Sequence, residues 1–279
     1  MDKTTAFFTF DEFHGKRDSA GTRIRAEWLI NYWPEAEIYK LGKKYQTIIF
    51  QKVYMPHFAR LNKDAGIKQI LDICDPDIFT RAVHEDNIFM ESAQYMNAIT
   101  TSTENLAKQV QKYFEIPVRC IPDRLDLELF KEKKVHQGEA KSVVWFGYSQ
   151  NSQVLDLIKE KVLNRLGLRL IVISDKPHDQ ADEFIKWDLE TFNTDLIKAD
   201  FCLLPDPRGF MGEFKSNNKE ITAQALGMPV AKSIDDLERF ISEEERKKES
   251  ELRLKEVKEK WDVKLSIQEM QDLIKEIKK

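Results

Sequence analysis

Short runs of apolar, β-forming residues recur along this chain and alternate with segments of helical periodicity. Many of the runs are apolar at successive positions, which is typical of parallel strands that are covered on both faces. We predict nine strands, over residues 6–10, 47–53, 67–73, 97–102, 118–123, 142–147, 168–174, 201–206 and 228–233.

Helical spacing fills several of the intervals between these runs. Ile24, Trp28 and Leu29 lie on one face of the first such segment, and Thr103 and Asn151 are suitable N-cap residues for two others. The predicted helices cover residues 20–33, 103–114, 151–166 and 217–227. Alternating strands and helices indicate βαβ units and therefore an α/β fold with parallel sheets.

The pattern also suggests a division of the chain. Residues 131–141 are polar, charged and without a period, so they are predicted to form an exposed linker between two domains. We expect an N-terminal domain over 1–122, a second domain over 123–260 and a terminal helix over 261–279. Ser266 and Glu269 have capping-box spacing at the start of that amphipathic helix, which is expected to pack back on the N-terminal domain.

Composition narrows the choice of function. The 279 residues suffice for two cores, and the net charge is only -4. Glycine occurs just 10 times, and neither a P-loop nor a GxGxxG motif is present. The three cysteines and five histidines have no metal-site spacing, so no metal site is predicted. There is no apolar run of membrane-spanning length and no signal-like start, so a cytoplasmic location is expected.

A polar segment after the strand at 201–206 carries the clearest chemical signal. Lys215, Ser216, Asn218 and Lys219 precede or begin a helix that ends at Gly227. A helix N-terminus offers unpaired amides and the positive end of the helix dipole, both of which favour a phosphate. An anion site can therefore form here without a glycine-rich loop. An ordinary solvated loop with two surface lysines is the equally weighted alternative.

The same segment resembles a known family. KSNNKEITAQALGMPVA, residues 215–231, resembles the donor-site signature of GT-B glycosyltransferases of the group 1, family 4-like type. Residues 99–130, 142–158 and 184–205 are similar to further stretches of that family. The resemblance implies two Rossmann-like domains, an acceptor domain followed by a nucleotide-sugar donor domain, with a deep interdomain cleft and a C-terminal amphipathic helix.

The family resemblance also implies an activity. A hexosyl or pentosyl group would be transferred from a nucleotide sugar, with a UDP- or GDP-sugar as the first expectation. The acceptor would be a glycan, a lipid-linked molecule or another hydroxyl-bearing molecule. The reaction would need neither a metal nor a permanently bound cofactor. The positions that match the family's donor site are Gly147, Tyr148, Trp187, Lys215, Ser216, Asn218, Lys219 and Thr222.

Two departures from the family pattern stand out. Many members carry a pair of glutamates separated by seven residues, and the second contacts the donor ribose; here the two places are Phe214 and Thr222, with Glu213 one position away. The Asn-Gly usual in the crossover between the domains is replaced by Asp123-Arg124. The ribose contact and the stereochemical course are therefore left open.

Candidates for acceptor chemistry lie in the N-terminal domain. The loop after the first strand contains Ser19, Gly21, Thr22, Arg23 and Arg25, of which Arg23 could meet a phosphate or an acidic acceptor. His84 and Glu85 follow a later strand, and either could act as a base on an acceptor hydroxyl. A surface role for the arginine and a structural role for the histidine are the competing interpretations.

Alternatives to this function remain. Asp75-Pro76-Asp77 matches the metal-binding Asp-x-Asp of single-domain GT-A glycosyltransferases. A non-catalytic nucleotide- or sugar-binding module could share the fold, as could an enzyme that glycosylates nucleic acid bases. Residues 1–122 hold 16 basic and 16 acidic side chains, so this segment has no net positive charge that would favour a nucleic acid partner. Peripheral membrane contact is a further alternative, and the sequence leaves the oligomeric state open.

Overall fold

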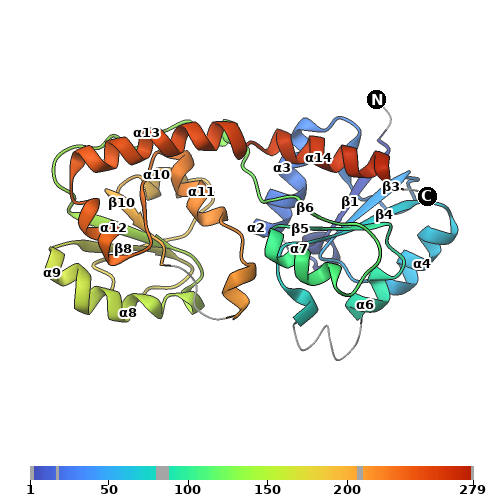
Figure 1. The fold of residues 1–279 in the computed structure, drawn as a ribbon, viewed down its shortest axis with the longest axis horizontal. Coiled ribbons are helices and arrows are strands. Elements are labelled where there is room, and N and C mark those ends of the chain that lie inside the picture. The colour runs from blue at the N-terminus through green and yellow to red at the C-terminus, as the bar shows by residue number, and fades with distance from the viewer. Residues whose placement is uncertain (1–2, 17–18, 80–87, 206–209, 278–279) are drawn as a thin grey trace. The chain divides into compact units, whose positions relative to one another are not determined.

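The chain divides into two compact units in the computed structural model, which describes residues 3–16, 19–79, 88–205 and 210–277. The first unit contains Met1–Leu125, Arg208–Ser216 and Val263–Lys279, and the second contains Asp126–Pro207 and Asn217–Asp262. Each unit holds a parallel β-sheet, drawn as arrows in Figure 1, with helices packed around it.

The sheet of the first unit has the strand order β2-β1-β3-β4-β5-β6, and all neighbouring pairs are parallel. Its strands are β1 (Thr5–Thr9), β2 (Ala36–Ile38), β3 (Thr47–Gln51), β4 (Lys68–Ile73), β5 (Ala98–Thr101) and β6 (Val118–Cys120). The chain leaves β1 in one direction toward β2 and then in the other toward β3. Ligands of open α/β sheets bind beyond the carboxyl ends of the strands at such a reversal.

The helices of the first unit include those that connect its parallel strands, as the strand direction requires. They are α1 (Phe10–His14), α2 (Ala20–Thr22), α3 (Trp28–Tyr32), α4 (Pro56–Asp64), α6 (Ile88–Ala93), α7 (Glu104–Gln111) and, from the end of the chain, α14 (Val263–Glu276). A π-helical turn, Arg23–Glu27, joins α2 to α3, and 3-10 turns cover Asp77–Phe79 and Phe210–Phe214. Buried residues from the strands, including Phe50 and Leu71, form the core with Leu106 of α7.

The second unit has the strand order β11-β10-β7-β8-β9, again all parallel. Its strands are β7 (Ser142–Phe146), β8 (Arg169–Ser174), β9 (Glu183–Lys186), β10 (Phe201–Leu203) and β11 (Val230–Ala231). The strand order reverses between β7 and β10. The loops after these two strands therefore flank the expected ligand crevice of this sheet.

The helices of the second unit surround a core of sheet residues that includes Val143, Leu170 and Phe201. They are α8 (Val154–Ile158), α9 (Asn164–Leu166), α10 (Phe192–Leu196), α11 (Asn218–Ala225), α12 (Ile234–Arg239) and α13 (Glu243–Lys260). A π-helical turn, Lys159–Leu163, lies between α8 and α9, and 3-10 turns cover Leu127–Leu129 and Ser149–Asn151. No helix among the described residues is long and apolar enough to cross a membrane.

Most elements confirm the predicted alternation, since each of the nine predicted strand segments overlaps a strand. The sequence pattern missed β2 and β9, each of which is a short strand at one edge of its sheet. An edge strand has a neighbour on one side alone and tolerates charged residues, so β9 alternates between half-buried and exposed positions. The helix predicted from Asn151 begins instead at Val154, because Asn151 belongs to a 3-10 turn.

Two local predictions are wrong. Residues 131–141 are part of the second unit rather than a linker, although most of their side chains are exposed as predicted. His136 is buried with its Nε2 atom 2.9 Å from the Gly227 carbonyl oxygen, and the Lys134 amide donates to the Leu226 carbonyl at 2.8 Å. The polar composition of the segment gives no sign of these contacts, because backbone groups and one buried imidazole make them.

The predicted capping box is the second error, because α14 begins at Val263 and Ser266 lies inside the helix. Arg124 donates to Ser266 Oγ at 3.0 Å and to both carboxylate oxygens of Glu269, at 2.8 and 2.7 Å. The two polar residues therefore fasten α14 to the crossover segment within the first unit. This contact accounts for the arginine that replaces the glycine usual in the crossover of the family.

Candidate functional site

Gly147 and Lys219 meet at the reversal point of the second sheet. Gly147 directly follows β7 and has a φ of +154°, a conformation that residues with side chains rarely adopt. A Cβ atom at Gly147 would lie within 3.0 Å of the Lys219 Nζ atom, closer than Cβ atoms approach other atoms. The lysine ammonium also stands 5.1 Å from the centroid of the Trp145 ring. The glycine thus leaves room for a cation at the carboxyl end of β7.

The N-terminus of α11 adds further donors beside that lysine. The first amides of a helix have no acceptor within the helix and mark the positive end of its dipole. Asn217 is the N-cap, and its side chain makes no capping hydrogen bond to the first turn. The Asn218 Nδ2 atom is buried and has no hydrogen-bond partner among the described residues. A buried donor of this kind calls for an acceptor, and an anionic oxygen would meet that need.

Aromatic side chains border the same edge of the sheet. Trp187 follows β9, and its amide donates to the Ser174 carbonyl at 2.8 Å. The Trp187 ring lies 6.5 Å from that of Phe192, which in turn lies 5.2 Å from Phe146 at the end of β7. Tyr148 follows Gly147 and is largely exposed. Flat apolar surfaces at strand ends are suited to stacking on a planar base.

Asp175 is a polar residue of this edge that the sequence interpretation missed. It directly follows β8, and its carboxylate accepts hydrogen bonds from the Ser149 amide at 2.7 Å and the Ser149 hydroxyl at 3.1 Å. These bonds lower the pKa of Asp175, the one from the Ser149 amide most of all. An aspartate immediately after an apolar run that ends a strand was the signal available in the sequence.

The glutamate pair of the family has no counterpart among the side chains at its two places. Thr222 is buried in the second turn of α11. Phe214 is buried in the core of the first unit, 5.5 Å from the ring of Phe79. Glu213 is exposed, and its backbone oxygen accepts from Asn105 Nδ2 at 3.2 Å. A ribose contact through this pair is therefore not available in the form the family uses.

Lys215 and Ser216 make their contacts in the first unit. The Lys215 ammonium lies 2.7 Å from one oxygen of Asp75, and Lys52 lies 2.7 Å from the other. Burial raises the pKa of Asp75, but the charge of Lys52 and the hydrogen bonds from both lysines outweigh it and hold the pKa at about 2. Ser216 donates a side-chain hydrogen bond to Asp123. Lys215 and Ser216 thus belong to the first unit, whereas Asn218 and Lys219 belong to the second.

Lys52 and Asp77 complete the cluster around Asp75. Lys52 has a φ of +53°, in the left-handed region that a lysine rarely occupies. Its ammonium is 3.6 Å from Asp77, which also accepts a hydrogen bond from the Tyr54 hydroxyl. Burial, opposed by Lys52, leaves the pKa of Asp77 raised. Both carboxylates of the Asp-Pro-Asp segment thus face cations of the protein itself, which disfavours the metal-binding interpretation.

A buried ion network supports the carboxyl ends of β4 and β6. Arg25 forms ion pairs with Asp72 and with Asp123, the latter at 3.1 Å, and donates to the Ile121 carbonyl. All three charged side chains are buried, and the two carboxylates outweigh the effect of burial to raise the pKa of Arg25. The aspartate that departs from the family's Asn-Gly is therefore half of a structural pair.

The predicted catalytic candidates of the first unit are only partly described. Arg23 lies in the π-helical turn, half-buried, with its guanidinium carbon 5.9 Å from the Trp28 ring centroid. His84 and Glu85 lie outside the described residues. Their roles stay predictions.

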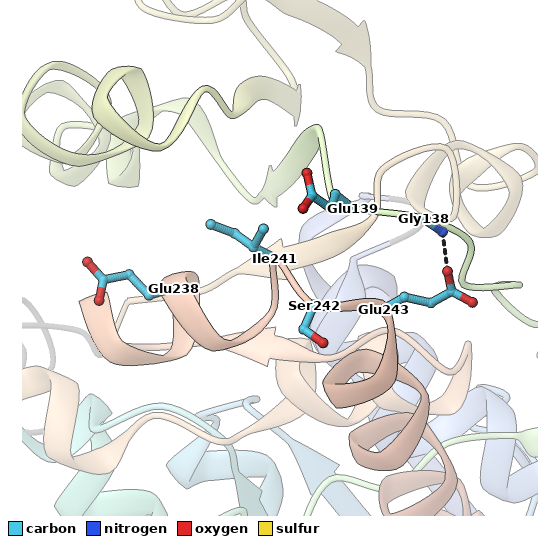
Figure 2. Close-up of a pocket in the computed structure, with 6 residues that line it drawn as sticks. All are labelled: Gly138, Glu139, Glu238, Ile241, Ser242 and Glu243. Atoms are coloured by element: carbon cyan, nitrogen blue, oxygen red, sulfur yellow. Dashed lines mark hydrogen bonds between the residues drawn. The ribbon is translucent and has the colours of Figure 1, made fainter.

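A shallow depression of about 540 Å³ lies at a different place in the second unit, as Figure 2 shows. Three carboxylates line it, and one of them, Glu243, accepts a hydrogen bond from the Gly138 amide. Its lining residues are Gly138, Glu139, Glu238, Ile241, Ser242 and Glu243. So many acidic groups would repel a phosphate, so this depression is a poor candidate for a nucleotide.

Comparison with known proteins identifies the fold through solved structures. No protein-family model and no curated protein matches the chain. Among solved structures, HepE from Anabaena in complex with UDP and glucose matches with a TM-score of 0.69 and 8% identity, over 99% of this chain and 100% of that one. TarM matches with a TM-score of 0.62 and 11% identity over 81% of this chain, which spans about half, 54%, of TarM.

A third match is the catalytic domain of starch synthase IV from Arabidopsis thaliana, bound to ADP and acarbose. Its TM-score is 0.51 with 12% identity, over 83% of this chain and 73% of that domain. The chain has the GT-B fold. The predicted α/β class with two Rossmann-like domains is confirmed, and the single-domain GT-A alternative is wrong. The domain boundaries and the cleft between the domains stay predictions.

Proposed function

We propose that the protein is a glycosyltransferase that moves a sugar from a nucleotide-sugar donor to a hydroxyl-bearing acceptor. One observation carries the proposal: the ammonium of Lys219, a residue in the first turn of α11, lies against Gly147 at the reversal point of the second sheet, and the neighbouring Asn218 Nδ2 atom is buried without a partner among the described residues. This is the place where an open α/β sheet binds a nucleotide. The GT-B fold of the chain supports the same activity.

Glycosyl transfer makes a specific demand on this site. The bond between the anomeric carbon and the diphosphate oxygen breaks while the acceptor oxygen bonds to that carbon, so negative charge grows on the leaving diphosphate. Donors aimed at that charge accelerate the reaction because they bind the transition state more tightly than the substrate. Lys219 and the α11 amides are proposed to do this work, which makes the reaction independent of a metal.

The remaining donor contacts follow from the edge of the sheet. Trp187 and Tyr148 are proposed to border the base, and Thr222 to face the donor from α11. HepE was solved with UDP and the starch synthase with ADP, so nucleoside diphosphates are the first ligands to test. We propose a UDP- or GDP-sugar as the donor and a hexose or pentose as the sugar.

The acceptor is assigned to the first unit. Arg23, His84 and Glu85 remain the proposed contacts to a glycan, a lipid-linked or another hydroxyl-bearing acceptor. Asp75 is a poor base while Lys52 and Lys215 hold its pKa at about 2, because a base of that strength takes up a proton only weakly at neutral pH. Lys215 and Ser216 stay proposed as phosphate contacts on the family resemblance.

A non-catalytic binding module is the second candidate. The observation in its favour is the pair Phe214 and Thr222, one in a core and the other buried in α11, at the places of the family's two glutamates. Such a module would bind a nucleotide sugar without turning it over.

Two measurements separate these functions. A thermal-shift screen against UDP-, GDP-, ADP- and CMP-sugars identifies the donor, because a ligand of the native state raises the melting temperature. Release of nucleoside diphosphate from that donor then distinguishes an enzyme from a binding module. Lys219→Ala is expected to reduce the shift and the release, whereas Lys255→Ala, an exposed lysine on α13, removes the same charge elsewhere and should change neither. No shift with any donor would contradict the proposal.

A further inference from the structure

Asp175 directly follows β8, the strand that pairs with β7 before the Gly147 turn. The strands β7 and β8 pair in register, with Phe146 opposite Ile173. The Gly147 amide continues this pairing by donating to the Ile173 carbonyl at 3.1 Å. Asp175 is two residues beyond that carbonyl, so its carboxylate lies beside the turn through which a diphosphate would be held.

The carboxylate of Asp175 is fixed in place yet exposed. Its Oδ1 atom accepts from the Ser149 amide at 2.7 Å and the Ser174 hydroxyl at 3.1 Å, and its Oδ2 atom accepts from the Ser149 hydroxyl at 3.1 Å. A carboxylate offers about four acceptor positions. One position on Oδ2 therefore remains, and either serine hydroxyl can rotate away to open a second.

Other acidic groups on this edge are differently engaged. Glu220 of α11 pairs with Lys232 at 2.7 Å and accepts from Gln224. Asp188, after β9, accepts the Glu190 amide at 2.8 Å and lies one strand further from Gly147. Thr222 occupies the place of the family's ribose-binding glutamate and carries no carboxylate. Among the described residues, Asp175 is thus the carboxylate next to the glycine turn.

We propose that Asp175 accepts hydrogen bonds from the ribose hydroxyls of the bound nucleotide and makes the site specific for ribonucleotides. This inference rests on the proposed function, since it needs a nucleotide held at Gly147 and Lys219. The ribose 2′- and 3′-hydroxyls are two adjacent donors, and a carboxylate presents two adjacent acceptors. An acidic side chain at the end of the strand beside the glycine turn serves this purpose in other Rossmann-like folds.

The test compares UDP with 2′-deoxy-UDP by isothermal titration, or GDP with 2′-deoxy-GDP if the screen identifies a guanosine donor. The wild-type protein should bind the ribonucleotide about 10- to 100-fold more tightly, the range expected for a hydrogen bond to a charged group. Asp175→Asn should lose most of that preference by weakening the ribonucleotide alone. Glu251→Gln, the same change at an exposed position of α13, should keep the preference.

The outcomes separate this inference from the function on which it rests. Equal binding of the two nucleotides by the wild type would overturn the inference without requiring any variant to fold. An unchanged preference in Asp175→Asn would also overturn it. In either case a Lys219→Ala variant that weakens both nucleotides alike would leave the diphosphate site standing. If neither nucleotide binds the wild type, the inference and the proposed function both fail.

Discussion

Replacing Gly147 by alanine adds one methyl group against Lys219 in the proposed diphosphate site. The new Cβ atom would lie within 3.0 Å of Lys219 Nζ and 3.2 Å from Trp145 Cη2, and the backbone would have to keep a φ of +154°. The lysine side chain is flexible and can swing aside, but the ammonium then leaves its place over the turn. The buried Trp145 ring has less freedom to move.

The two effects have different sizes and different readouts. A side chain in an unfavourable backbone region costs about 1–3 kcal/mol of folding free energy. Loss of a hydrogen bond from an ammonium to a phosphate costs about 1.5–3 kcal/mol of binding free energy, which is roughly a 10- to 100-fold weaker Kd. Urea unfolding measures the first, and titration with UDP, GDP or ADP at a temperature where the variant is folded measures the second.

Gly167→Ala is the matched control for this variant. Gly167 ends α9 in the same unit with a φ of +68°, and a Cβ there would meet no atom within 4 Å. It should lose stability through backbone strain and keep its nucleotide affinity. The reasoning is refuted if Gly147→Ala binds nucleoside diphosphates as well as the wild type, or if the control weakens binding by the same factor.

Three further sites, with a control at Arg60, test the fold by urea unfolding. Arg25→Met should cost about 3–5 kcal/mol because two buried carboxylates lose their cation, while exposed Arg60→Ala should cost almost nothing. Arg124→Ala should lower the free energy of unfolding by about 1–3 kcal/mol, because it removes the hydrogen bonds from Arg124 to both Ser266 and Glu269 of α14. Glu269→Gln should lower it less, because the bond to Ser266 remains. Burial lowers the pKa of His136, so the folded state resists its protonation and loses stability as the pH falls below about 6.5; His136→Gln should reduce that loss between pH 7 and 5. An equally steep loss in the variant would contradict this role.

The strand and helix alternation was predictable because parallel strands buried on both faces leave apolar runs. The same reasoning failed at the edge strands β2 (AEI) and β9 (EFIK), because they are short and their charged residues interrupt the apolar run. It also failed at Ser266 and Glu269, whose spacing matches a capping box while their actual partner is Arg124. A local pattern cannot reveal a partner more than a hundred residues away in the chain.

Residues of the candidate site were predictable from the sequence where residue type and position along the chain are informative by themselves. Gly147 and Lys219 were singled out, and the structure brings them together. In the sequence Arg25 is one of several loop residues, and only the structure shows its two buried carboxylate partners. Asp175 carries a weak signal in the sequence, because an aspartate after a strand is common. Lys215 was grouped with Lys219 by spacing, yet its contact is with Asp75, which only the packing of the first unit determines.

Equilibrium binding of UDP, GDP and ADP to the wild-type protein and to Lys219→Ala tests the central claim most directly. The account predicts that at least one nucleoside diphosphate binds the wild type, that Lys219→Ala weakens it by about 10- to 100-fold, and that Lys255→Ala leaves it unchanged. Failure of all three diphosphates to bind, or equal affinity in the wild type and Lys219→Ala, would contradict a diphosphate site at Gly147 and α11.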